Sequence, residues 1–170
     1  MPRATAMIQF ALGGSSLGQI LVAATEVGVC SILMGASQNL LVCELQRRFP
    51  QAVLMRGDAE LAGLLSKVVD FVESPRSKLD VPLHLGGTAF QRSVWQALRE
   101  IPAGETASYS DIATWIGAPK SVRAVAQACA SNPAALAIPC HRVVRTDGSL
   151  ASYRWGVERK RSLLQRETGA

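Results

Sequence analysis

Residues 109–132, YSDIATWIGAPKSVRAVAQACASN, contain two short helical patterns separated by a tight turn. Gly117, Ala118 and Pro119 end the first pattern, because glycine and proline do not continue a helix, and the second pattern follows directly. Two short helices joined in this way have the proportions of a helix-turn-helix, at about 109–131. The stretch therefore predicts a helical C-terminal region.

The second helix of this unit predicts an exposed face of small side chains. The apolar positions expected to face the core are Val122, Val125, Ala126 and Cys129. The opposite face is expected to carry Ala124, Gln127, Ala128 and Ser131, with Arg123 at its edge. Small side chains let a helix approach a narrow groove closely, whereas long polar ones usually read base edges. Helix propensity or packing also explains alanines, so both interpretations stay open.

The chain before residue 80 predicts a small α/β lobe. Apolar, β-branched stretches predict strands at 8–13, 18–25 and 27–35. Helical spacing follows at 37–49, with Ser37 as a cap, and again from residue 58. The stretch 74–87 is rich in proline, serine, glycine and charge, which predicts a connection to a second lobe at 86–170. That lobe is expected to begin with a helix capped by Thr88.

Positive charge is concentrated at the C-terminal end. The net charge is +5, but residues 1–119 hold 9 Lys and Arg against 10 Asp and Glu, whereas residues 120–170 hold 9 against 3. Such a surface suits a polyanion, nucleic acid above all, although many basic surfaces are simply solvated. No apolar run approaches the ~20 residues of a membrane span, and the N-terminal stretch has no secretory pattern. We expect a cytoplasmic protein that does not bind membranes.

Cys140, in IPCHRVV (138–144), is the cysteine with polar neighbours. The other cysteines lie in apolar stretches and are expected to be reduced side chains of the core: Cys30, Cys43 and Cys129. No CxxC pair or disulfide framework is present. Cys140 is therefore the candidate for thiol chemistry.

A reactive Cys140 needs a group that takes or displaces its proton. The chain has two histidines, His84 and His141, and neighbouring side chains on an extended strand point apart, so a contact with His141 requires a turn or a bridging water. A thiol hydrolase would need a third group, for which Glu167 is a candidate, and an oxyanion hole that no pattern marks. Two neighbouring ligands do not make a metal site. The residues alone leave these alternatives open.

Three stretches together resemble the O6-alkylguanine-DNA alkyltransferases. They are GETASYSDIATWIGAPKSVRAVAQACASNP (104–133), IPCHRVV (138–144) and DGSLASYRWGVERKRSLLQRE (147–167). The resemblance covers about the last 85 residues strongly, and the N-terminal lobe only by its order of strands and helices. It implies an α/β fold: a ribonuclease-H-like lobe at 1–80, then a helical lobe at 86–170 with a winged-helix-like helix-turn-helix and an active-site loop at 138–144.

The resemblance also implies a reaction. Members of this family flip O6-methylguanine out of duplex DNA and move its alkyl group to a cysteine in one irreversible displacement, so each molecule acts once. The implied function is DNA repair by a methylated-DNA–protein-cysteine S-methyltransferase. Its implied partner is double-stranded DNA that contains O6-alkylguanine. The protein is expected to act as a monomer and without a cofactor.

The implied catalytic residues lie in and around the active-site loop. By the resemblance, Cys140 accepts the alkyl group, His141 deprotonates it through a water, and Glu167 orients the imidazole. Asn132 resembles the hinge asparagine that ties the helix-turn-helix to the loop. Tyr109 is similar to the tyrosine that assists flipping and bonds the base.

Further positions of the resemblance concern the DNA and the base. Arg123 is similar to the side chain that enters the duplex and fills the gap left by the flipped base. The implied DNA-binding residues are Arg123, Tyr109, Lys120, Ala124, Gln127 and Ala128. The implied base pocket is formed by Tyr153 with backbone groups of Cys140, Val143 and Arg154.

The sequence departs from the family pattern at Ser152, where a close relative has glycine, so the tolerance for bulky alkyl groups is open. Some members hold zinc in the N-terminal lobe, but Cys30 and His84 make no complete ligand set here, and we expect no metal. The rival functions are a lesion-binding protein without repair, against which Cys140 argues, a transcriptional regulator and a thiol hydrolase.

Overall fold

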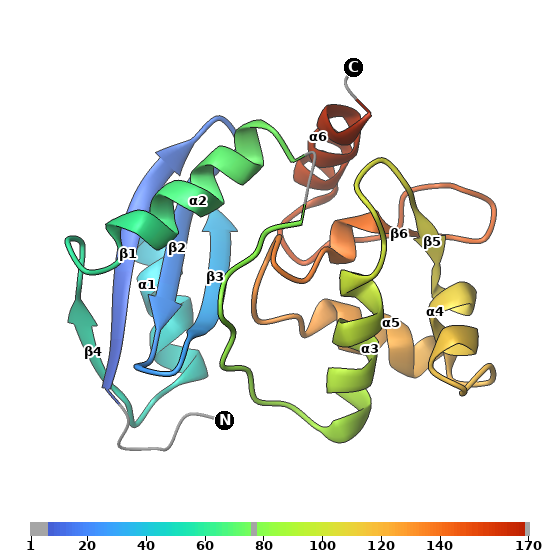
Figure 1. Cartoon of the computed structure of the whole chain (residues 1–170), viewed down its shortest axis with the longest axis horizontal. Coiled ribbons are helices and arrows are strands. Elements are labelled where there is room, and N and C mark those ends of the chain that lie inside the picture. The colour runs from blue at the N-terminus through green and yellow to red at the C-terminus, as the bar shows by residue number, and fades with distance from the viewer. Residues whose placement is uncertain (1–6, 76–77, 169–170) are drawn as a thin grey trace.

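The computed structural model describes residues 7–75 and 78–168. Its chain forms an N-terminal part built on a sheet and a C-terminal part built of helices, which lie side by side (Figure 1). Residues 1–6 lie outside the described residues, and so do residues 76–77 of the predicted connection between the lobes. The fold class expected from the sequence, an α/β lobe followed by a helical lobe with a helix-turn-helix, is confirmed.

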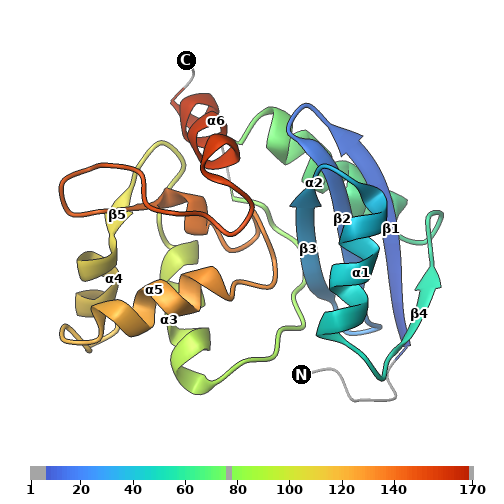
Figure 2. The same ribbon diagram turned by 180° about the vertical axis from the view of Figure 1, so that it is seen from behind.

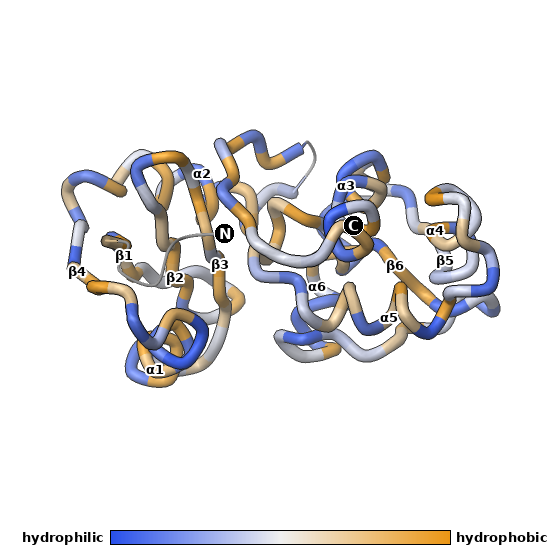
Figure 3. Tube along the Cα trace, turned by 90° about the horizontal axis from the view of Figure 1, so that it is seen from below, coloured by the Kyte–Doolittle hydropathy of each residue, from blue (hydrophilic) through white to orange (hydrophobic). Residues whose placement is uncertain are grey.

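The N-terminal part contains a four-stranded mixed sheet in the order β3-β2-β1-β4. The strands are β1 (Met7–Ser15), β2 (Gly18–Ala24), β3 (Val29–Gly35) and β4 (Val53–Arg56). The first three pair antiparallel, and β4 pairs parallel with β1. Strands β2 and β3 are largely buried. Their residues are mostly hydrophobic, as the tube colours of Figure 3 show.

Two helices cover the two faces of this sheet. Helix α1 (Gln38–Arg48) packs on β2 and β3, and α2 (Ala62–Glu73) packs on β1 and β2 from the other side (Figures 1 and 2). Ser37 caps α1 as predicted, because its side chain accepts a hydrogen bond from the backbone N–H of Leu40. The apolar residues of each helix that face the sheet exclude water from it.

The C-terminal part is built of four α-helices: α3 (Ala89–Arg99), α4 (Tyr109–Trp115), α5 (Val122–Ala130) and α6 (Val157–Glu167). Thr88 and Gln91 form a capping box at the start of α3, and Ser108 and Asp111 form another at α4. Strands β5 (Ala107–Ser108) and β6 (Val143–Val144) pair in parallel. This short pairing holds the start of α4 beside the segment that follows Cys140.

The outer edge of β3 joins the two parts. The backbone N–H of Val29 donates to the carbonyl of Pro82, and that of His84 donates to the carbonyl of Val29. Further along β3, Ile32 donates to the carbonyl of Pro133, and Ala135 donates to the carbonyl of Ile32. The segment that leads into the active-site loop is therefore fixed to the N-terminal sheet by backbone hydrogen bonds.

Four details differ from the sequence prediction. Strand β4 was not predicted, and α2 begins at Ala62 rather than near residue 58, because residues 58–61 form turns. Cys43 was expected to be a side chain of the core, and this is wrong, because it lies on an exposed position of α1. Ala128 was placed on the exposed face of α5, and this is wrong: it is 2% exposed, since it lies one turn after the buried Val125.

Candidate active site

Cys140 lies at the start of a single 3₁₀ turn, η1 (Cys140–Arg142), within the loop that connects α5 to β6. The backbone here forms a turn and not the extended strand considered for this stretch, and the described residues show no direct hydrogen bond between Cys140 and His141. The segment before it contains Leu136 in the left-handed region, with φ of 74°. Strain of this kind is tolerated where surrounding contacts fix the backbone, as the hydrogen bonds to β3 do here.

His141 is completely buried and is bonded to Glu167 of α6. Its Nε2 lies 2.6 Å from Glu167 Oε2, so the carboxylate holds the proton on Nε2 and leaves Nδ1 with a free lone pair. Nδ1 is buried and has no hydrogen-bond partner among the described residues. An imidazole oriented in this way can accept a proton at Nδ1.

Arg142 completes the buried charge cluster. Its Nε donates to both carboxylate oxygens of Glu167, at 3.0 and 2.9 Å, and its Nη1 donates to the carbonyl of Ile101 at 2.7 Å. Hydrogen bonds from His141 and Arg142 outweigh burial and hold the pKa of Glu167 below its ordinary value. Burial lowers the pKa of His141, which is therefore neutral at rest. Arg142 had no predicted role.

Asn132 connects the end of α5 to the reactive sulfur. Its Nδ2 donates to the carbonyl of Ile138 at 2.8 Å and to Cys140 Sγ at 3.1 Å, while its Oδ1 accepts from the backbone N–H of Ala134 at 2.9 Å. All three bonds are buried. The side chain thus fixes the loop from both ends and orients the sulfur lone pairs, as a hinge position requires.

Cys140 is buried, with 5% of the residue exposed to solvent. Burial raises the pKa of Cys140 to about 11. The hydrogen bond from Asn132 and the nearby charge of Lys160 lower it, but by less. The resting side chain is therefore a protonated thiol. A reaction at this sulfur must remove the proton as the new bond forms.

A cavity of about 60 Å³ opens beside Cys140. One wall comes from α5, and the other from the segment before α6. The lining residues are Tyr109, Ala126, Cys129, Ala130, Cys140, Ser152, Tyr153 and Arg154.

The predicted pocket residues are placed unequally around this cavity. Tyr109, Tyr153 and Arg154 line it, whereas Val143 is fully buried in β6 and does not. Tyr153 packs edge-on against Trp155, with ring centroids 5.3 Å apart, and its buried hydroxyl has no partner among the described residues. Burial raises the pKa of Tyr109 to about 12, so its hydroxyl stays protonated.

The predicted DNA-binding residues fall into two groups. Lys120, Arg123 and Gln127 are exposed and Ala124 is half-buried, so these side chains are accessible from solvent. Ala128 is not: its carbonyl accepts a hydrogen bond from the indole of Trp95 at 2.9 Å, and its methyl group faces the core. The small residues of α5 that border the cavity are instead Ala126 and Ala130.

Lys160 is a buried cation that sequence reasoning missed. It is 0% exposed, its Nζ lies 3.5 Å from the carbonyl of Ala151, and burial lowers its pKa. The sequence offered no signal for it, because VERKRSLLQRE resembles a solvated basic helix. Its charge acts on the sulfurs of Cys129 and Cys140.

His84 is excluded as the base for Cys140 by its position. Its Nδ1 lies 2.7 Å from the hydroxyl of Thr25, in the turn between β2 and β3. Within residues 7–75 and 78–168, no three His, Cys, Asp or Glu side chains are grouped closely enough to hold a metal ion. In the same residues no helix has the length and apolarity to cross a bilayer.

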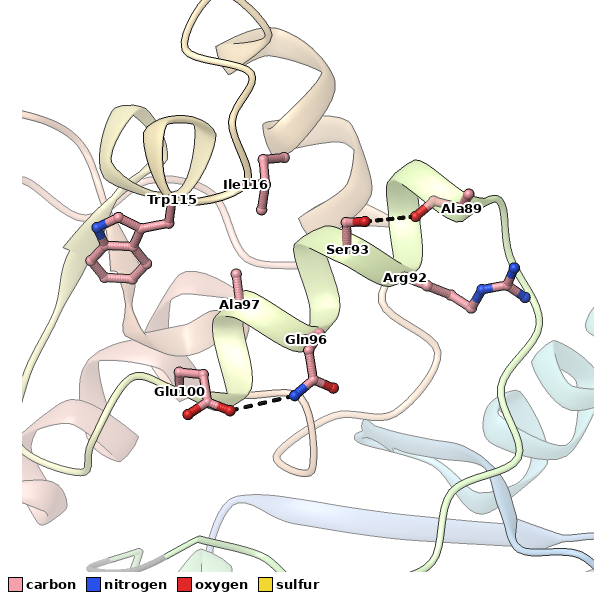
Figure 4. A pocket seen from close by; sticks show the side chains of 8 residues that line it. All are labelled: Ala89, Arg92, Ser93, Gln96, Ala97, Glu100, Trp115 and Ile116. Carbon is pink, nitrogen blue, oxygen red and sulfur yellow. Dashed lines mark hydrogen bonds between the residues drawn. The ribbon is translucent and has the colours of Figure 1, made fainter.

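A much larger hollow, about 670 Å³, lies between α3 and α4 (Figure 4). It is bordered by Arg92, Gln96 and Glu100 on α3 and by Trp115 and Ile116 at the end of α4. Its lining contains no cysteine and none of the predicted site residues.

Comparisons with known proteins point to one family. Residues 89–169 match the family described as "6-O-methylguanine DNA methyltransferase, DNA binding domain". The inducible methylated-DNA–protein-cysteine methyltransferase of Bacillus subtilis is 44% identical over 138 residues, 79% of this chain and 77% of that one. The crystal structure of the Mycobacterium tuberculosis O6-methylguanine methyltransferase superposes with a TM-score of 0.79 at 32% identity, covering 96% and 94% of the two chains. The chain belongs to the methylated-DNA–protein-cysteine methyltransferase family.

The bifunctional transcriptional activator and DNA repair enzyme Ada of Escherichia coli is also similar. It is 50% identical over 160 residues, which make up 94% of this chain and 45% of Ada. The chain therefore spans less than half the length of this relative, in its C-terminal part. The M. tuberculosis protein solved in complex with DNA matches with a TM-score of 0.78.

Proposed function

We propose that the protein repairs O6-alkylguanine in double-stranded DNA by moving the alkyl group irreversibly to Cys140. The observation that carries the proposal is a buried pair of contacts, Asn132–Cys140 and His141–Glu167. Cys140 lines a small cavity, and the imidazole of the next residue is oriented with its Nδ1 free of a partner among the described residues. Membership in the family and the DNA complex of a similar protein support it.

The reaction follows from these positions. The proton of Cys140 passes through a bridging water to Nδ1 of His141, whose Nε2 remains bonded to Glu167. The sulfur attacks the alkyl carbon, the S–C bond forms, and the C–O6 bond breaks with its electron pair left on guanine. The Tyr109 hydroxyl donates its proton to the departing guanine. The proton that left the thiol finally restores the Tyr109 hydroxyl. The products are a thioether and guanine.

A thioether has no remaining proton and is a poor leaving group, so the proposal limits each molecule to one turnover. No further reactant is needed, which agrees with the expectation of no cofactor. The methyl acceptor and all residues that line the cavity come from one chain, so the proposed active form is a monomer. A thiol acceptor also has to stay reduced, as it does in the cytoplasm.

The DNA-binding surface proposed here is the exposed side of α5. Arg123 would enter the duplex and replace the flipped base, while Lys120 and Gln127 contact the strand and Ala124 permits close approach. Flipping costs a few kcal/mol, less for a damaged base. Contacts to phosphates offset this cost and make binding weaker as salt increases.

The test is the intact mass of the protein after mixing with a duplex that contains one O6-methylguanine. We expect a gain of one CH₂ that saturates at one equivalent. Fragment ions must place it on Cys140 rather than Cys129, because cleavage after Arg123 and Arg142 leaves both on one peptide. Tight, salt-sensitive binding without a mass gain would instead identify a lesion-binding protein that does not repair.

A further inference from the structure

Helix α1 of the N-terminal part lies on the same side of the molecule as α5. Figure 2 shows both helices facing the viewer, and Figure 3, turned by 90°, shows both along its lower side. Helix α2 covers the opposite face of the sheet. DNA that approaches α5 therefore approaches α1 as well.

The cavity at Cys140 is lined by α5, and its opposite wall is bonded to α1 through Arg154. Ala126 and Ala130 of α5 form one wall, and Ser152 to Arg154 form the other. Behind the second wall, Arg154 Nη2 bonds to Glu44 of α1 at 2.9 Å, while its Nη1 donates to the carbonyl of Asn132. A strand that delivers a base to the cavity thus has α5 on one side and the C-terminal end of α1 on the other.

This end of α1 carries positive charge that the protein does not neutralise. Arg47 and Arg48 occupy its last turn and are exposed. Among the described residues neither forms an ion pair, and Glu44 is already bonded to Arg154. Desolvation, and after it the like charge of Arg154, lower the pKa of Arg48. Three cations against one carboxylate leave a local excess of positive charge, which attracts an anion such as a phosphate.

We propose that Arg47 and Arg48 form a second DNA contact, which binds phosphates of the duplex on the α1 side of the lesion. The inference rests on the proposed function and extends the DNA-binding surface from the helix-turn-helix to the N-terminal part. Basic side chains bind phosphates without reading sequence. The contact positions the duplex over the cavity and does not take part in methyl transfer.

The experiment measures duplex affinity at several salt concentrations for the wild type, for Arg47→Ala with Arg48→Ala, and for the control Lys67→Ala. Lys67 is exposed on α2, on the other face of the sheet. We expect the double variant to bind roughly tenfold more weakly at low salt, with the slope of log K against log salt reduced by about one to two. The control is expected to match the wild type.

Replacement of both arginines by lysine separates charge from structure. We expect Arg47→Lys with Arg48→Lys to restore the slope, and all variants to react equally with free O6-methylguanine base, which has no phosphates. Unchanged affinity and slope in the alanine variant would overturn the inference, as would loss of affinity that lysine does not restore. Failure of the wild type to accept a methyl group is a separate result, since it contradicts the proposed function.

Discussion

Glu167 is shared between a buried imidazole and a buried guanidinium, so it has two tasks. Its charge balances Arg142, and its Oε2 orients His141. Removing one partner of a buried ion pair typically costs about 3–5 kcal/mol. We expect Glu167→Gln to lower the melting temperature and to slow methyl transfer, whereas His141→Gln slows transfer with a smaller loss of stability. Thermal unfolding and single-turnover rates of the two variants measure these effects. An unchanged melting temperature for Glu167→Gln would contradict the stabilising role of this carboxylate.

The burial of Cys140 predicts slow alkylation of its thiol by small reagents. Because burial raises its pKa to about 11, the free protein should react slowly with iodoacetamide at neutral pH, and faster as pH rises. The exposed Cys43 should be labelled first. Peptide masses after timed labelling give the order. Labelling of Cys140 before Cys43 at pH 7 would indicate a resting thiolate instead.

The residues of the site were predictable to different degrees. Cys140 could be singled out from its polar neighbours, but its link to Glu167 came from the family resemblance, since 27 positions of sequence separate them. Nothing in the sequence indicated that Arg142 and Lys160 are buried, because a buried cation and a solvated one look the same in a basic stretch. Burial is set by the packing of α3, α5 and α6, which no local pattern contains.

Helix α5 allows a direct test of which side faces DNA. Ala124 is half-buried at the surface, and Ala128 lies against Trp95 in the core. We expect Ala128→Leu to destabilise the fold by about 1–3 kcal/mol through overpacking. Ala124→Leu should change stability by less than about 0.5 kcal/mol but weaken DNA binding, because a larger side chain holds the helix away from the groove. Denaturant unfolding and duplex affinity of both variants decide which alanine faces DNA. A loss of affinity in Ala128→Leu and a loss of stability in Ala124→Leu would place Ala128 at the DNA instead.

Elements with strong local signals were predicted well, and the others were not. Caps at Ser37 and Thr88 fixed two helix starts, and continuous apolar runs marked β2 and β3. Strand β4 was missed because its four residues, largely exposed, show no alternation that distinguishes them from a loop. It forms only because β1 offers a free edge for parallel pairing, which is a contact between distant segments.

At the scale of the whole molecule, the buried charges predict acid sensitivity. The folded-state pKa values of His141 and Glu167 both lie below their ordinary values of 6.5 and 4.5. The unfolded chain therefore binds more protons than the folded protein in acid, and the free energy of unfolding falls as pH drops below about 6.5 and further below about 4.5. Denaturant titrations from pH 7.5 to 4 measure the fall. In His141→Gln the part near pH 6 should be absent.

The N-terminal part supports the site although it supplies none of the catalytic groups. Backbone hydrogen bonds from β3 hold residues 133–135, directly after Asn132, and Glu44 holds Arg154 at the cavity wall. A single hydrophobic cluster runs from Ile8 to Leu163 through both parts. Loosening the sheet should therefore disturb the cysteine loop.

The edge-on packing of Tyr153 against Trp155 gives the protein an optical reporter of its own. Tyr153 lines the cavity, so a base or an added methyl group that moves its ring also changes the surroundings of the indole behind it. Trp95 and Trp155 are 3% and 5% exposed, whereas Trp115 is 56% exposed, so the two buried indoles emit from environments less polar than that of the third. Tryptophan emission of the unlabelled protein should follow base entry and alkylation in real time.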